Sequence, residues 1–222
     1  SWSWEGRYTM VETETTASLF RIEDQNDILV NLVAMRADNG TGPDFNIRLF
    51  IDGHKSSSSP VTLDLPNVNI WDENPWYISV TNEWGDTRNK ATLRCIKTSG
   101  TYIVEHYSAS IAYEKQAAAK SSTTLHSGIP LFAIDEATPT TAQELRYYVG
   151  KDPTPKTYQT NWNPSNTHLA RTLEYSGKLS HMRFWTKSLS RLEQVEHSHN
   201  PYSVATQSPI TSNLSLIHIS EP

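Results

Sequence analysis

Apolar and polar side chains alternate along most of this 222-residue chain, in short runs that are separated by Gly-, Pro-, Asn- and Ser-rich turns. Alternation with a period of two is typical of strands that bury one face. It predicts strands at residues 2–11, 18–22, 28–36, 45–52, 61–65, 76–81, 90–98, 101–113, 129–134, 145–150 and 179–184. The last run is not a clean alternation, which predicts a β-bulge near His181.

One short helix is predicted after the last strand. Ser190 and Glu193 have the spacing of a capping box, in which each side chain bonds the other residue's backbone amide. Pro201 forbids continuation of the helix. The apolar residues of this segment are predicted to share one side of the helix: Leu189, Leu192 and Val195.

The order of these elements predicts an all-β fold. Strands that alternate with helices of 10–15 residues, as in α/β proteins, are absent. We therefore expect one antiparallel two-sheet β-sandwich, a jelly roll, with one short helix near its end. The predicted domain covers residues 1–201.

Neither end of the sequence resembles the natural terminus of a protein. Residues 202–213 are small and polar, and we interpret them as a linker to a missing downstream region. Residues 214–222, LSLIHISEP, resemble a translated sequencing-library adapter, and we expect them to be an artefact outside the fold. We expect the native protein to extend in both directions.

Charge and composition restrict the classes of partner that we expect for this protein. The net charge is −5 and no basic block occurs, which argues against a nucleic-acid partner. No run approaches the roughly 20 apolar residues of a membrane span. Cys95 is the single cysteine and lies in the apolar run ATLRCI, so we expect a buried thiol and no disulfide framework.

The closing segment and one central strand resemble the laminin G-like, concanavalin A-like lectin superfamily. The central strand begins with Trp76. The closing signature consists of Gly177, Leu179, Met182, Arg183, Phe184, Trp185, Leu189, Ser190 and Glu193. The resemblance implies a concanavalin A-like jelly roll that binds a glycan or a protein, as one module of a larger surface protein.

Two loops carry the chemistry of sugar recognition, which needs apolar ring faces beside planar polar groups. In the first loop and a nearby turn, these residues are Trp71, Asp72, Asn74 and Trp84, with Asp86 beside them. In the second loop they are Asn161 and Trp162. The alternative is that these Trp side chains only cover the edge of the sandwich.

Metal sites have weaker support. No cofactor is predicted, although four aspartates in two turns offer oxygen ligands of the kind that calcium prefers: Asp24, Asp27, Asp38 and Asp44. Their spacing is not that of an EF-hand, and a solvated acidic turn is the alternative. His197 and His199 lie in no zinc motif.

No catalytic residue is predicted. The carboxylate pattern Glu-x-Asp-x-x-Glu, the G-x-S-x-G elbow and the P-loop do not occur. The leading hypothesis is a non-catalytic, lectin-like module, extracellular or on a virion surface. Two alternatives stay open: a structural or attachment domain of a viral capsid, spike or tail protein, and a glycoside hydrolase on the same scaffold.

Overall fold

The elements of the fold follow the predicted alternation closely. The computed structural model describes residues 1–11, 16–23, 28–36, 45–51, 61–83, 85, 88–100, 102–114, 146–149, 177–204 and 214–216. The strands and the helix are β1 (Trp2–Met10), β2 (Thr16–Glu23), β3 (Ile28–Arg36), β4 (Phe45–Ile51), β5 (Val61–Pro66), β6 (Trp76–Glu83), β7 (Arg88–Ser99), β8 (Tyr102–Glu114), β9 (Arg146–Val149), β10 (Gly177–Trp185), α1 (Arg191–His199) and β11 (Leu214–Leu216). The predicted strand at 129–134 lies outside the described residues.

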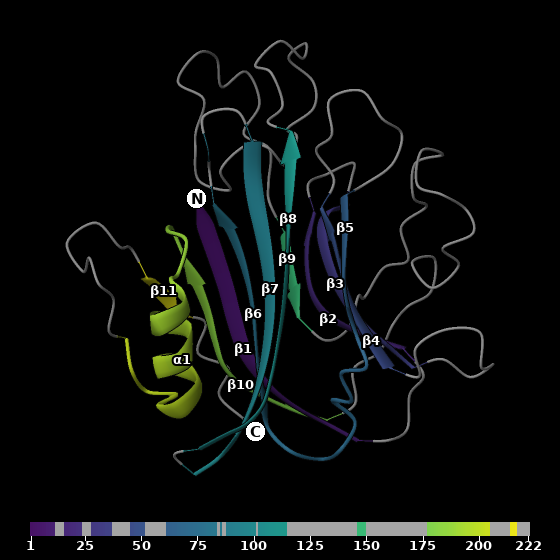
Figure 1. Ribbon diagram of the computed structural model, residues 1–222, viewed down its shortest axis with the longest axis vertical. Helices are drawn as coiled ribbons and strands as arrows, with labels where there is room; N and C mark the ends of the chain where they lie inside the picture. Colours follow the sequence, from purple (N-terminus) through teal and green to yellow (C-terminus); the bar gives the residue numbers. More distant parts are fainter. Residues whose placement is uncertain are drawn as a thin grey trace.

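The strands form two antiparallel sheets. Sheet A has the order β11-β10-β1-β6-β7-β8, and sheet B has the order β5-β4-β3-β2-β9. Figure 1 shows the two sheets face to face, with sheet A lying between sheet B and α1. The predicted all-β, two-sheet sandwich is confirmed, whereas the jelly-roll connectivity stays a prediction.

Aromatic side chains fill the space between the sheets. Trp2, Trp4 and Tyr8 alternate on the inner face of β1 and are at most 1% exposed. Trp4 stacks on Phe20 of sheet B at 4.5 Å between ring centroids. Burial of such large side chains contributes most of the favourable free energy of packing, and here it ties the two sheets together.

A β-bulge interrupts the pairing of β1 with β10, as the sequence predicts. The pairing shifts between Glu5↔Arg183 and Arg7↔Ser180, which leaves two residues of β10 opposite Gly6. The bulge contains His181, whose φ of 54° is in the left-handed region. A Cβ at position 6 would lie 2.4 Å from the sulfur atom of Met182, so any larger residue there would displace the Met182 side chain.

β11 continues sheet A beyond β10. It pairs Arg183 with Leu216 and Trp185 with Leu214. These three residues belong to the segment that resembles an adapter and that the sequence analysis set apart from the fold; the structure adds them to the edge of the sheet.

α1 covers the outer face of sheet A through its polar side. The predicted capping box is present: Glu193 N–H donates to the Ser190 hydroxyl, and Ser190 N–H donates to the Glu193 carboxylate. The predicted apolar side was wrong, because Leu192 is 70% exposed. The buried side chains of α1 are instead Glu193, Gln194, His197 and Ser198. Polar groups on the outer face of sheet A provide partners for them.

Candidate functional site

The predicted Trp71 loop is held by internal contacts. Trp71 is 3% exposed and packs against Phe45 at 5.9 Å between ring centroids. Its ring face is therefore inside the sandwich edge rather than open to solvent.

The neighbouring polar residues of that loop also have internal partners. Asp72 accepts hydrogen bonds from Trp76 Nε1 at 2.9 Å and from the Asn74 amide at 3.1 Å, and it forms an ion pair with Lys97. Burial raises the pKa of Asp72, but Lys97, Trp76 and Asn74 together hold it below its usual value. The Asn74 side chain donates to the backbone oxygen of Asp72 at 2.9 Å. In this structure the loop is braced against β6 and β7.

The other predicted residues lie outside the described part of the chain. This holds for the sugar-binding candidates Trp84, Asn161 and Trp162 and for the calcium candidates Asp24, Asp27, Asp38 and Asp44. Within the described residues, no group of three or more His, Cys, Asp and Glu side chains is placed to hold a metal ion.

A buried polar group lies at the ends of three strands, directly beside the predicted Trp84 and Asp86. We call Asn82, Asn89 and Tyr113 the amide cluster. Asn82 precedes the turn that contains Trp84 and Asp86, and Asn89 follows it. Tyr113 pairs with Asn89 across β7 and β8. The sheet thus brings all three side chains to one end of the sandwich.

The amide cluster leaves polar atoms without partners. The Tyr113 hydroxyl donates to Asn82 Oδ1 at 2.7 Å, and burial raises the pKa of Tyr113 to about 12 although both amides oppose this. Asn89 is close enough to influence that pKa, but neither of its amide atoms has hydrogen-bond geometry with a described residue. Asn82 Nδ2 is also unpartnered.

These unpartnered atoms carry an energetic cost. Asn82 and Asn89 are both 0% exposed, so water at the protein surface does not satisfy them. A buried polar group without a hydrogen bond costs roughly 1–3 kcal/mol. Such groups in a folded protein require an explanation, and an ordered water or ion bound between them is one.

Sequence reasoning missed Asn82 and Asn89 because it assigned residues 82–89 to a turn. In the structure β6 continues to Glu83 and β7 begins at Arg88. The period of two could have revealed them, since Asn82 continues the inward positions Ile78 and Val80.

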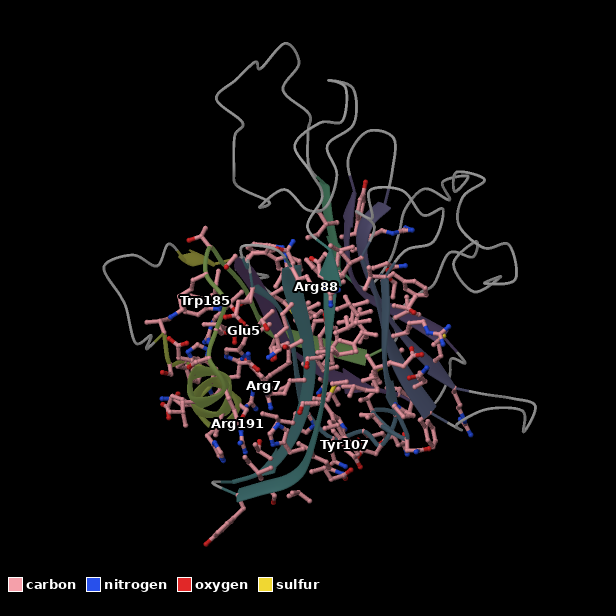
Figure 2. The ribbon with its side chains drawn as sticks, turned by 45° about the horizontal axis from the view of Figure 1, so that its top comes forward. Glu5, Arg7, Arg88, Tyr107, Trp185 and Arg191 are labelled. Atoms are coloured by element: carbon pink, nitrogen blue, oxygen red, sulfur yellow. The ribbon has the colours of Figure 1, made fainter. Side chains whose placement is uncertain are left out.

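A second polar network lies under α1. Glu5 accepts hydrogen bonds from Tyr77 at 2.6 Å and from Arg183 at 3.0 Å, and His197 Nδ1 lies 2.9 Å from the same carboxylate. The Arg7 guanidinium donates to the backbone oxygen of Ser198. Figure 2 shows Glu5 and Arg7 between sheet A and α1. Glu5 and His197 are at most 1% exposed, so this network joins the helix to the sheet.

Comparisons with known proteins name no relative. No protein-family model matches the chain, and no curated protein matches it significantly. The resemblance to the laminin G-like superfamily therefore stays a prediction from the closing signature. No helix among the described residues is long and apolar enough to cross a membrane.

Proposed function

We propose that the chain is a non-catalytic, lectin-like module that binds a glycan at the end of the sandwich where the amide cluster lies. The observation that carries this proposal is the set of three unpartnered amide atoms, Nδ2 of Asn82 and Nδ2 and Oδ1 of Asn89. They are gathered at one end of the sandwich, at the two strand ends that residues 84–87, including Trp84 and Asp86, connect in the sequence.

The chemistry of these groups suits a sugar. Each hydroxyl of a pyranose ring both donates and accepts hydrogen bonds, and an amide side chain also does both. Asn82 has a donor to offer, while Asn89 has a donor and an acceptor. Trp84 and Asp86 would add an aromatic face and a carboxylate, the other two elements of sugar recognition.

The wider role follows from the resemblance and from fold analogy, which guides function only weakly. We propose a module of a larger surface protein, on a cell or on a virion. A viral attachment role is compatible with the same glycan site, because a virion module can recognise its receptor through a sugar.

Asn89→Leu separates a binding role from a structural one. Replacing a buried unpartnered amide with an apolar side chain of similar size is expected to leave stability unchanged or to raise it by about 1 kcal/mol. If the amide serves a ligand, the same variant loses glycan binding. A glycan array on the wild type identifies the ligand, and calorimetry then measures its affinity for each variant.

Asn74→Ala is the matched control, because it removes an amide of the other candidate loop. We expect it to keep glycan affinity within about twofold, since among the described residues the Asn74 side chain hydrogen-bonds Asp72 alone. An array without any hit would contradict the glycan proposal. Loss of binding in Asn74→Ala but not in Asn89→Leu would move the site to the Trp71 loop.

A further inference from the structure

Three basic residues lie near one another on the outer face of sheet A, beside the first turn of α1. They are Arg94 on β7, His106 on β8 and Arg191 at the start of α1. This outer face is opposite to the inner face that carries Asn89 and Tyr113. The group is therefore separate from the amide cluster.

Arg94 is fixed at the centre of this group. It is 8% exposed, its Nε donates to Gln194 Oε1 at 2.6 Å, and its Nη1 lies 2.5 Å from His106 Nε2. A guanidinium has no acceptor atom, so Nε2 of His106 accepts this hydrogen bond. His106 is then neutral, with its proton on Nδ1.

The positive charges of the group repel one another. Burial, Arg94 and Arg191 all lower the pKa of His106 below its usual value. Burial and Arg191 likewise lower the pKa of Arg94. Each shift means that the positively charged form is disfavoured at that residue. A bound anion would offset this cost, because its negative charge attracts the cations.

Three carboxylates, those of Glu5, Glu193 and Glu105, are engaged elsewhere. Glu5 is bound by Arg183, Tyr77 and His197, as described above. Glu193 forms an ion pair with Lys187, and Glu105, the neighbour of His106 on β8, forms one with Lys97. Among the described residues, none of these carboxylates contacts Arg94 or His106, although the protein as a whole carries a net charge of −5.

We propose that Arg94, His106 and Arg191 form a binding site for an oxyanion, either a free sulfate or phosphate or the sulfate or carboxylate group of a sugar. Arg94 is held in place before binding, so little conformational entropy is lost when it donates to the ligand. Ser108 pairs with Arg94 across β7 and β8 and is exposed, so its hydroxyl adds a donor.

Binding of the anion is coupled to a proton. An oxyanion beside Arg94 favours the cationic form of His106, because opposite charges attract. His106 takes up a proton at Nε2, gives up its hydrogen bond from Arg94 and donates to the anion instead. The charged groups that face His106 are Arg94 from β7 and Arg191 from α1. Sulfate binding should therefore tighten as the pH falls through the pKa of His106.

The test follows the ring signals of His106 by NMR during titration of the whole chain with inorganic sulfate. We expect a saturable shift and a rise in the pKa of His106. Arg191→Gln should weaken sulfate binding about three- to fivefold, the factor of one exposed ion pair. His106→Gln should remove the pH dependence. Arg88→Gln is the matched control, because it removes the same charge about 20 Å away along β7.

The outcomes are distinct. A response that grows linearly with sulfate and is equal in Arg191→Gln and Arg88→Gln would reflect ionic strength alone and would overturn the proposal. A sulfated oligosaccharide and its unsulfated counterpart distinguish the source of the anion. Sulfate binding without any glycan binding would support this site while contradicting the proposed lectin function. Glycan binding that is unchanged in Arg191→Gln, together with no sulfate binding, would support the lectin function and contradict this site.

Discussion

The imidazole of His197 on α1 lies 2.9 Å from the carboxylate of Glu5 on β1, across a sequence separation of 192 residues. Trp185 stacks on the His197 ring at 5.3 Å between centroids and shields this contact. The other oxygen of Glu5 accepts from Arg183, whose side chain is 5% exposed. The contact thus joins the first and the last parts of the domain through buried charge.

Glu5→Gln should destabilise the protein strongly. The change removes the only negative charge that Arg183 contacts among the described residues, and it leaves that buried guanidinium without a counter-charge, with the Pro201 backbone oxygen as an acceptor. Breaking a buried ion pair in this way costs about 3–5 kcal/mol. Urea unfolding measures the loss. Glu196→Gln on the exposed side of α1 is the control, with an expected effect within about 0.5 kcal/mol.

The same carboxylate predicts a loss of stability in acid. Burial raises the pKa of Glu5, but the hydrogen bond and charge of His197, with Tyr77 and Arg183, hold it below its usual value. A carboxyl whose pKa is lower in the folded state stabilises that state above its unfolded pKa of about 4.3. This stabilisation disappears as the pH falls from there through the folded pKa.

Unfolding free energies measured from neutral pH into this acid range test the prediction. The curve of Glu5→Gln should be flatter than that of the wild type, because the variant has no proton to gain at this position. Parallel curves would show that Glu5 has the same pKa in the folded and unfolded states and would contradict the ion-pair network.

Ser190→Ala should remove one half of the capping box. Glu193 N–H then loses its acceptor at the first turn of α1, which costs about 0.5–2 kcal/mol. Thermal unfolding measures the loss, and Ser110→Ala on the exposed part of β8 is the control. An unchanged melting temperature in Ser190→Ala would show that the cap does not contribute to the stability of the domain.

Local rules were sufficient to predict the strands and the cap. The apolar run predicted the nine-residue strand Ile28–Arg36 without error, because Val30, Leu32 and Ala34 on its inner face lie in the hydrophobic core. The broken alternation around His181 and the spacing of Ser190 and Glu193 can both be seen in neighbouring residues, so the sequence indicates the bulge and the capping box.

Contacts between distant elements were beyond the reach of the same rules. α1 buries Gln194 and His197 rather than Leu192, because Arg94, Ser79 and Glu5 stand on the strands beneath it. Nothing near position 194 indicates those partners. Trp71 was proposed as a solvent-facing sugar platform for the same reason, since its contact with Phe45 joins two segments that are separated along the chain.

Cys95 offers an internal probe of sheet A. Its side chain is 0% exposed, as the sequence predicts, and burial raises the pKa of its thiol despite the nearby Arg94. The thiolate is the form that attacks thiol reagents, so the native protein should react only through opening of β7. Because Cys95 is the single cysteine, the absorbance of Ellman's reagent reports this site alone.

The labelling rate of Cys95 should therefore follow the stability of the α1–β1 contact. When opening and closing are fast relative to labelling, the rate is proportional to the population of the open form. Glu5→Gln should then accelerate labelling at least about 100-fold, the factor that corresponds to its expected destabilisation. Glu196→Gln should label at the wild-type rate. Rapid labelling that is equal in all three proteins would mean that β7 opens locally, without release of the helix from the sheet.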